Sequence, residues 1–390
     1  MTLVPSTRRV MVVFGTRPEA IKLAPVILAL AGSQAFEPVV VVTAQHREML
    51  DQVLETFGIV PARDLDISKD RQTLTDVTVR GLQRLTPLLE QDAPDAVVVQ
   101  GDTTTTFVGA LAAFYHRVPV VHVEAGLRTG DPYSPYPEEI NRRLTTQVTS
   151  LHLAPTRTAK RNLLAEGVDE SRVVVTGNTV IDALLWTVDR DAGTDDADLE
   201  GVGLDGRRLI LVTAHRRESW GPGLASVGRA LATIAGTEPD VDIVFPIHRN
   251  PRVREAIVPA LHGLPNVRLL EPLPYAPFAR LMRRAHLIVT DSGGIQEEGP
   301  SLGKPVLVMR DSTERPEAIS AGTVRLIGTD EHAMAGAVRT LLHDEAAYAA
   351  MATAVNPYGD GHAAHRTVEA LLHFFALGPP AEEFDAGGAG

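Results

Sequence analysis

Short apolar runs recur along most of the chain, separated by stretches whose apolar residues follow a helical period. In the first half the runs are nearly continuous and rich in valine, as is typical of strands buried on both faces of a parallel sheet. The predicted strands are Val10–Phe14, Val39–Thr43, Ala96–Gln100, Pro119–Val123 and Val173–Thr176. Amphipathic stretches such as Ala20–Leu30 and Leu74–Leu89 predict helices between them. The alternation indicates a doubly wound α/β sheet.

A second alternation of the same kind follows a polar interval. Residues 189–206 are rich in Asp and Gly and predict a surface crossing between domains. The strands predicted after it are Leu209–Thr213, Val241–Pro246, Val267–Leu270, Leu287–Thr290, Pro305–Met309 and Val324–Ile327. The pattern of His362–Phe375 predicts a last helix, and the composition of residues 377–390 predicts a disordered tail. A chain of 390 residues therefore fits two consecutive α/β domains better than one large sheet.

Composition and charge exclude several kinds of protein. The chain has no cysteine, which rules out disulfides, thiolate metal sites and a cysteine nucleophile. The formal net charge of −12 argues against non-specific binding to nucleic acid or to an anionic membrane. The first apolar run, Val10–Phe14, is too short for a signal peptide or a membrane span, so we expect a cytoplasmic protein.

Polar residues that directly follow the predicted strands are the candidates for function, because ligands of open α/β sheets bind beyond the carboxyl ends of the strands. After Leu287–Thr290 come Asp291-Ser-Gly-Gly294 and then a helical pattern. Such a turn presents unpaired N–H groups and the positive end of the helix dipole, and two glycines let a phosphate approach the backbone. The turn indicates an anion site, although an ordinary βα turn has the same features.

The first predicted strand is followed by Gly15-Thr-Arg-Pro-Glu-Ala-Ile-Lys22. Pro18 and Glu19 are normal signals for the start of a helix. Arg17 and Lys22 are not, because cations in the first turns oppose the helix dipole unless an anion is shared there. We interpret the two cations as functional; solvated surface residues are the alternative.

Acidic residues follow two strands that are consecutive in the chain. Asp102 comes after Ala96–Gln100 and Glu124 after Pro119–Val123, so the two carboxylates are neighbours if the strands are. Such a pair raises the proton affinity of each member and suits general acid–base chemistry. Asp102 could equally be a helix N-cap. Glu138 and Glu139 open a later helix, where acids are favourable in any case.

Basic and imidazole side chains occupy matching positions in the second half. His215 follows the first strand there, His248 follows the second, and Arg315 precedes a helix that begins with Pro316. A single His at a strand end is more often structural, but two beside several arginines indicate anion recognition. The sequence has no HExxH motif and no clustered Asp, so we expect no metal site.

Several motifs occur in a fixed order: Phe14-Gly-Thr-Arg-Pro-Glu-Ala20, Ala44-Gln-His-Arg47, Gly101-Asp-Thr-Thr-Thr-Thr106, His122-Val-Glu-Ala-Gly-Leu-Arg128, His215-Arg-Arg-Glu218, Asp291-Ser-Gly-Gly-Ile-Gln-Glu-Glu298 and Glu314-Arg-Pro-Glu317. Together they resemble the non-hydrolysing UDP-N-acetylglucosamine 2-epimerases, from about Val10 to Phe375. The resemblance implies an α/β fold like that of glycosyltransferase B, with a nucleotide-sugar in the cleft between two Rossmann-like domains. These would be residues 1–180, joined by the C-terminal helix 362–376, and a nucleotide-binding domain, residues 181–361.

The activity that the resemblance implies is reversible conversion of UDP-GlcNAc to UDP-ManNAc by a homodimer, with neither metal nor nicotinamide cofactor. No carbonyl group acidifies the hydrogen at C2 of this sugar, so simple deprotonation is too costly. Elimination of UDP to a 2-acetamidoglucal, followed by re-addition after protonation of the other face, would invert C2. That route needs carboxylates or imidazole near C2 and cations on the departing pyrophosphate.

The resemblance also assigns roles to individual residues. It gives the proton chemistry to Asp102, Glu124, Glu138 and His215. It gives the UDP-sugar contacts to Arg17, Lys22, His215, Phe278, Ser292, Gly293, Gly294, Glu298 and Arg315. Bacterial members also bind a second UDP-GlcNAc as an activator, and the matching positions are Gln45, His46, Arg71, Gln72 and His248.

Three alternatives to this epimerase remain open from the sequence. They are a glycosyltransferase of similar fold, a non-catalytic sensor of sugar nucleotides, and an epimerase of a related UDP-diacetamido-uronic acid. The clustered carboxylates favour an epimerase over a transferase, which usually needs a single base. Deuterium entering C2 of UDP-GlcNAc without an acceptor would distinguish the epimerase from a glycosyltransferase and from a sensor. Substrate trials would distinguish it from the related epimerase.

Overall fold

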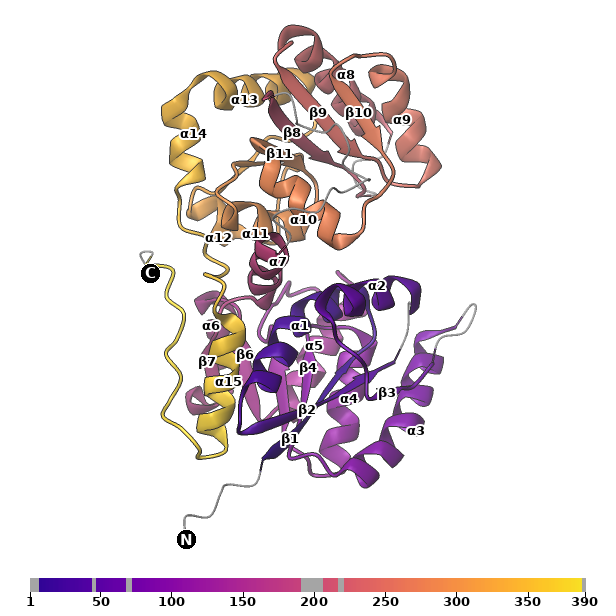
Figure 1. Ribbon diagram of the computed structural model, residues 1–390, viewed down its shortest axis with the longest axis vertical. Coiled ribbons are helices and arrows are strands. Elements are labelled where there is room, and N and C mark those ends of the chain that lie inside the picture. The colour runs from indigo at the N-terminus through magenta and orange to yellow at the C-terminus, as the bar shows by residue number, and fades with distance from the viewer. Residues whose placement is uncertain (1–6, 44–46, 68–71, 191–205, 217–220, 388–390) are drawn as a thin grey trace. The chain divides into compact units, whose positions relative to one another are not determined.

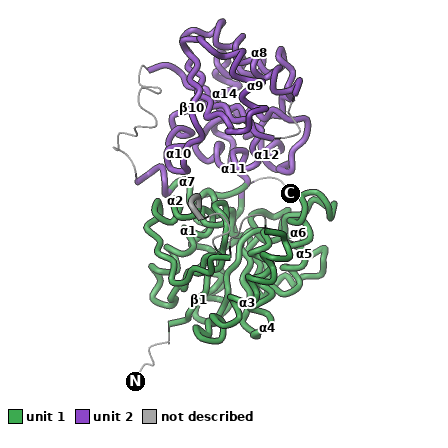
Figure 2. Tube along the Cα trace, turned by 90° about the vertical axis from the view of Figure 1, so that its right-hand side faces the viewer, with its two compact units in different colours: residues 1–185, 358–385 green, residues 186–357, 386–390 purple. Residues whose placement is uncertain are grey.

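The structure is a computed structural model that describes residues 7–43, 47–67, 72–190, 206–216 and 221–387. The chain divides into two compact units (Figure 2). Unit 1 comprises residues 1–185 and 358–385, and unit 2 comprises residues 186–357 and 386–390. The chain leaves unit 1 within helix α7 (Thr179–Arg190) and returns to it between Pro357 and Tyr358.

Unit 1 is built on a seven-stranded parallel sheet in the order β3-β2-β1-β4-β5-β6-β7 (Figure 1). Its strands are β1 (Arg8–Phe14), β2 (Phe36–Val42), β3 (Arg63–Asp64), β4 (Ala96–Gln100), β5 (Val120–Val123), β6 (Leu151–Ala154) and β7 (Val173–Val175). Every residue of β4, β5 and β6 is buried, which explains why these strands lack polar alternation.

The helices of unit 1 gather in two sets. They are α1 (Arg17–Gly32), α2 (Arg47–Phe57), α3 (Leu74–Asp92), α4 (Thr104–Tyr115), α5 (Glu138–Val148), α6 (Arg157–Ala165), the 3-10 turn Glu170–Arg172 and α15 (Ala363–Phe374). Helix α1 packs with α2 and with α15, whereas α4 packs with α3 and α5. Right-handed crossovers on either side of β1 and β4 produce such an arrangement.

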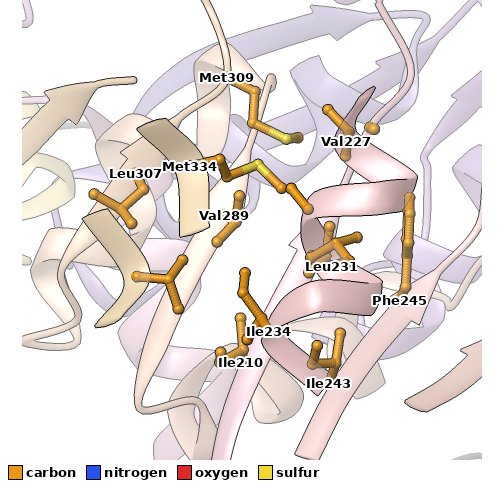
Figure 3. Close-up of a cluster of buried hydrophobic side chains, with 14 of the residues drawn as sticks. Ile210, Val227, Leu231, Ile234, Ile243, Phe245, Val289, Leu307, Met309 and Met334 are labelled. Carbon is orange, nitrogen blue, oxygen red and sulfur yellow. The ribbon is translucent and has the colours of Figure 1, made fainter. Parts of the chain in front are cut away.

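Unit 2 repeats the plan with a six-stranded parallel sheet in the order β10-β9-β8-β11-β12-β13. Its strands are β8 (Arg208–Thr213), β9 (Val241–Pro246), β10 (Val267–Leu270), β11 (Leu287–Thr290), β12 (Val306–Val308) and β13 (Val324–Leu326). Its helices are α8 (Pro222–Thr237), α9 (Pro251–Leu261), α10 (Tyr275–Arg284), α11 (Gly293–Ser301), α12 (Pro316–Ser320), α13 (Glu331–His343) and α14 (Glu345–Ala352). Figure 3 shows its apolar core, where α8 and α13 pack against the strands.

The two parallel sheets with alternating helices confirm the predicted pair of Rossmann-like α/β folds. The predicted strands differ from the observed ones by a few residues at most, but β6 and the two-residue β3 were not predicted. The segment Leu151–Ala154 has only four residues, and His152 interrupts its apolar run. No helix in the described ranges combines the length and the apolar character that a membrane span requires.

Composition predicts disorder for residues 377–390, but the described part of this tail contains ordered contacts. Phe384 is buried, and its N–H donates to Val175 O at 2.7 Å. The carboxylate of Glu383 accepts hydrogen bonds from Val175 N at 3.1 Å and from Lys160 Nζ at 3.0 Å. A single aromatic residue therefore holds this segment against β7, a signal that average composition conceals.

Candidate functional site

Both sheets reverse their strand order at one place, and four of the predicted motifs lie there. In unit 1 the reversal falls between β1 and β4, and in unit 2 between β8 and β11. Ligands of open α/β sheets bind at such switch points, beyond the carboxyl ends of the strands. The loops that begin at Gly15 and Gly101 lie at the first, and those that begin at Ala214 and Asp291 at the second.

In unit 1, the buried carboxylate of Glu19 joins the loops that follow β1 and β4. It accepts hydrogen bonds from Gly15 N at 3.0 Å and Thr16 N at 2.8 Å, and from the hydroxyls of Thr103 at 2.6 Å and Thr106 at 3.0 Å. Burial raises the pKa of Glu19 despite these bonds. The sequence analysis took Glu19 only as a helix-start signal, whereas it fixes one loop to the other.

Glu124 is the most constrained acid of unit 1. It is 8% exposed and its φ is +61°, a left-handed conformation that is strained for a residue with a side chain. Lys22 Nζ lies 2.5 and 2.6 Å from its two carboxylate oxygens. The Gln100 amide also donates to the carboxylate, and Asn178 Nδ2 does so at 3.1 Å. Strain that the surroundings maintain in this way is characteristic of functional sites.

Asp102 lies beside Glu124 in the sheet, as the order β4-β5 requires, and Gly101 N donates to Val123 O. The side chain of Asp102 pairs with Arg142 on α5. Each carboxylate thus has a cation beside it, Lys22 for Glu124 and Arg142 for Asp102. The mutual effect of the two acids on their proton affinity stays a prediction.

The backbone between these acids is held by a buried histidine. His122 Nε2 lies 2.7 Å from Gly101 O, and burial lowers the pKa of His122 to about 4. The ring is therefore neutral at neutral pH, and Nε2 carries the proton because a carbonyl can only accept. His152 stands opposite His122 on β6, and burial lowers its pKa to about 3.

Helix α5 presents its two opening acids differently. Glu139 is fully buried and accepts from Thr129 N at 3.0 Å and Gly130 N at 3.3 Å; these bonds and Arg142 lower its pKa although burial acts to raise it. Glu138 is half-buried and, among the described residues, makes neither a hydrogen bond nor an ion pair. One helical turn separates Glu138 from Arg142, so both lie on the face that reaches Asp102.

In unit 2, Asp291 organises the loop that follows β8. Its buried carboxylate accepts from His215 N and Arg216 N, each at 2.8 Å, and its other oxygen lies 3.0 Å from His215 Nδ1. Burial acts to raise the pKa of Asp291, but the contact with His215 and the two N–H groups hold it below its usual range. The His215 side chain is 44% exposed, so Asp291 orients a ring that solvent or a ligand can reach.

A cation lies against the glycine turn of unit 2. A Cβ placed on Gly293 would meet Arg315 Nη1 at 2.8 Å, so a side chain at this position would displace the guanidinium. Arg315 Nε donates to Glu297 at 2.7 Å, and Glu298 is buried one turn into α11. In the described part of the chain, the Ser292 side chain accepts no hydrogen bond from the first turn of α11. A guanidinium beside the positive end of a helix dipole favours a shared anion.

Glu314 links the remaining basic residues of this loop cluster. It lies 2.6 Å from Arg310, 2.8 Å from Arg216 and 3.4 Å from Arg315. Burial opposes its ionisation, yet its backbone hydrogen bond and the guanidinium groups of Arg310 and Arg216 lower its pKa to about 2. Glu314 and Glu297 belong to the quoted motifs, but the sequence pattern predicts no role for these two acids, which fix the arginines.

The other predicted residues are distributed over both units. Arg17 opens α1 in unit 1 and is half-buried, and Phe278 is half-buried on α10 in unit 2. The His248 ring lies 6.2 Å from the ring of His215, whereas Gln72 lies before α3 in unit 1. Gln45, His46 and Arg71 are outside the described residues. Within the described ranges, no group of three or more His, Cys, Asp or Glu could hold a metal ion.

Comparisons with known proteins identify the family of the chain. The family model for UDP-N-acetylglucosamine 2-epimerase matches residues 28–372. The chain is 56% identical to the UDP-N-acetylglucosamine 2-epimerase of Escherichia coli (strain K12) over 369 residues, 93% of this chain and 98% of that protein.

Solved structures are similar over the same range. The UDP-GlcNAc 2-epimerase of Neisseria meningitidis, bound to UDP-GlcNAc, is 49% identical with a TM-score of 0.84, over 94% of this chain and 100% of that one. The enzyme of Methanocaldococcus jannaschii, in complex with UDP-GlcNAc and UDP, is 33% identical with a TM-score of 0.75, over 94% and 99%. The chain therefore belongs to the UDP-N-acetylglucosamine 2-epimerase family.

Proposed function

We propose that the protein interconverts UDP-GlcNAc and UDP-ManNAc. Elimination of UDP gives a 2-acetamidoglucal, and re-addition of UDP with protonation of the other face inverts C2. The observation that carries this proposal is Glu124, a buried carboxylate held in a strained conformation at the switch point of unit 1. A reaction that removes a weakly acidic C2 hydrogen needs a base fixed in position before the sugar arrives. Family membership supplies the substrate.

We assign the proton transfers to the acids of unit 1 together with His215. Glu124 and Asp102 lie at adjacent strand ends, and Glu138 lies on the helix face that reaches Asp102. Proton removal from one face of C2 and delivery to the other require two groups, and these residues offer more than one. His215, oriented by Asp291, is suited to carry a proton for the departing or returning oxygen.

We assign the diphosphate to the turn Ser292-Gly293-Gly294 and to Arg315, and we keep Arg17 and Lys22 as proposed contacts of the UDP-sugar. Developing negative charge on a departing diphosphate is stabilised by fixed N–H dipoles and guanidinium groups. Glu298 and Phe278 are proposed to contact the rest of the nucleotide. We also propose that Gln72 and His248, with Gln45, His46 and Arg71, bind a second UDP-GlcNAc as an activator.

We further propose a cytoplasmic homodimer that associates through α5. Ile140 and Leu144, one turn apart, are 37% and 44% exposed, whereas Glu139 of the same helix is buried. In the preceding loop Tyr133 and Tyr136 stack with ring centroids 6.3 Å apart, and both are more than half exposed. Light scattering on Leu144→Glu should show monomers where the unaltered chain gives dimers; dimers in both would reject this surface.

Incubation of UDP-GlcNAc in heavy water without an acceptor tests the reaction. We expect deuterium at C2 of both sugars and free glucal on prolonged incubation, followed by NMR. A glycosyltransferase would leave C2 unlabelled and release UDP only with an acceptor, and a sensor would bind without labelling. Labelling of a UDP-diacetamido-uronic acid but not of UDP-GlcNAc would show that the substrate differs from the proposed one while the reaction type is the same.

A further inference from the structure

Asn178 is a buried residue between β7 and α7. Its side chain and its backbone N–H form hydrogen bonds with three different parts of the chain. Its side-chain Nδ2 donates to Glu124 Oε1 at 3.1 Å, and its Oδ1 accepts from Val180 N at 3.2 Å. Its backbone N–H donates to Tyr358 O at 2.7 Å. One residue thus contacts the acid of the proposed reaction, the first turn of α7 and the segment through which the chain returns to unit 1.

These two segments are the ones through which the chain passes between the units. It leaves unit 1 along α7 and re-enters it at Tyr358, so the Asn178–Tyr358 hydrogen bond joins the two crossings inside unit 1. A second link lies one turn further along α7, where the Asp182 carboxylate accepts from Ala363 N at 3.2 Å and Ala364 N at 2.7 Å. The start of α15 is thereby fixed to α7.

Close backbone packing around Asn178 leaves little room for it to shift. Gly177 has φ +86°, which favours glycine, and a Cβ there would lie 3.5 Å from Gly359 Cα. A Cβ on Gly359 would meet Ile181 at 3.3 Å and both Asn178 N and Asn178 O at 3.5 Å. The backbone position of Asn178 is therefore set by the crossing, whereas its side chain sets the position of Glu124.

An amide suits this place better than other side chains of its size. The Glu124 carboxylate can only accept, so its partner must donate, while Val180 N needs an acceptor. Asparagine does both, and aspartate would put a second carboxylate 3.1 Å from the first. Gln100 and Lys22 also donate to Glu124, but they lie on β4 and α1.

We propose that Asn178 is a positioning residue that fixes the Glu124 carboxylate for proton transfer and ties its orientation to the two chain crossings. The inference rests on the proposed function of Glu124. Removal of the amide leaves the diphosphate site in unit 2 intact, so it acts on the chemical step rather than on nucleotide binding.

The test compares Asn178→Ala, Asn178→Asp and Gly359→Ala with the control Asn266→Ala. Asn266 is a buried asparagine of unit 2 whose Nδ2 donates only to backbone oxygens of Ala235, Glu238 and Val241. We expect kcat of Asn178→Ala to fall about 10- to 100-fold with little change in KM, because a small displacement of a catalytic group is sufficient for such a loss. Gly359→Ala, whose Cβ would press on Ile181 in the first turn of α7 beside Asn178, should lower kcat by about 5-fold.

Asn178→Asp has a signature that loss of stability does not produce. A new negative charge beside Glu124 should move the acidic limb of the kcat/KM profile to higher pH by about one unit. The control should lose thermal stability without either effect. A kcat within about twofold of wild type for Asn178→Ala, or losses that match those of Asn266→Ala at equal stability, would overturn the inference. Wild-type kcat for Gly359→Ala would overturn the link to the crossings.

Failure of the proposed function can be distinguished from failure of this inference. Carbon-13 labelling of glutamate, with the Glu124 signal assigned by Glu124→Gln, reports the environment of this carboxylate without turnover. If the wild type exchanges no C2 hydrogen but Asn178→Ala alters the titration of Glu124, the proposed reaction is wrong and the role of Asn178 in positioning Glu124 still holds. Normal turnover with an unchanged titration would refute the role of Asn178.

Discussion

The switch points of the two units have the same topology and opposite chemistry. In unit 1 basic residues hold acids: Lys22 holds Glu124, and Arg142 holds Asp102. In unit 2 acids hold basic residues: Glu297 holds Arg315, and Asp291 holds His215. The sheet determines where a site lies, and the loops determine its charge.

This difference indicates that the two units have different chemical roles. A carboxylate fixed by cations is suited to move protons, and a cation fixed by carboxylates beside a helix N-terminus is suited to hold an anion. Under the proposed function, unit 1 acts on the sugar carbon and unit 2 on the diphosphate. The predictions below test whether the two roles separate.

Glu124→Gln should give the largest effect. The amide cannot accept the C2 proton, so we expect kcat to fall about 10³-fold, whereas UDP affinity should stay within about threefold. Deuterium incorporation and calorimetry with UDP measure the two quantities. Glu37→Gln, in an exposed pair with Arg9, is the control and should change neither. Loss of UDP binding in Glu124→Gln would contradict this separation of roles.

Arg315→Met should have the opposite signature. Removal of the guanidinium beside Gly293 should weaken UDP binding about 20- to 100-fold, the range expected for a charge-assisted hydrogen bond. Glu124 and its partners belong to unit 1, so kcat at saturating substrate should change less. Arg339→Met, whose guanidinium lies 3.7 Å from Glu238, removes an exposed ion pair and serves as the control. Equal losses in both variants would show that net charge alone matters.

Acid should affect unit 1 in a way that follows from its buried histidines. The pKa values of His122 and His152 are lowered to about 4 and about 3 in the folded protein, whereas the ordinary value is 6.5. As the pH falls below 6.5, the unfolded chain binds protons that the folded chain does not, so the folded state loses stability. Each histidine should lower the free energy of unfolding by about 2 kcal/mol between pH 7 and pH 5.

Asp182 should act in the opposite direction. Burial raises its pKa to about 6, so its favourable contribution is lost as pH rises and is regained on acidification. His152→Leu should reduce the acid-induced loss by about 2 kcal/mol, and Asp182→Asn should increase it by about 1 kcal/mol. Hydrogen exchange of β5 and β6 amides, compared with β9 and β11, measures both. A loss that neither variant changes would contradict the assignment.

The sequence predicted the architecture well because buried parallel strands are almost wholly apolar. It missed β6 because His152 is a buried polar residue, whose neutral state only the surrounding structure explains. Candidate sites could be predicted from the rule that functional groups follow the strands, and Glu124, Asp102, His215 and Arg315 all do. Gln100 and Asn178 end or follow predicted strands as well, so the same rule could have found them.

Contacts between side chains were less predictable. Lys22 was expected to bind an anion, and in the structure its ammonium group lies on Glu124. A lysine side chain is long and flexible, and sequence does not indicate which of several partners it contacts. Likewise, Glu138 and Glu139 are adjacent acids in one helical turn, and only packing shows that Glu139 is buried while Glu138 is not.

The C-terminal segment has one more consequence. β7 is the last strand of its sheet, and Phe384 N and the Glu383 side chain take up the N–H and the carbonyl of Val175 that would otherwise face outward. An open strand margin of this kind is a template on which another polypeptide can pair. Truncation of the chain before Glu383 would therefore be expected to promote aggregation of folded molecules. A purification tag joined beyond Asp385 would leave the edge of β7 covered.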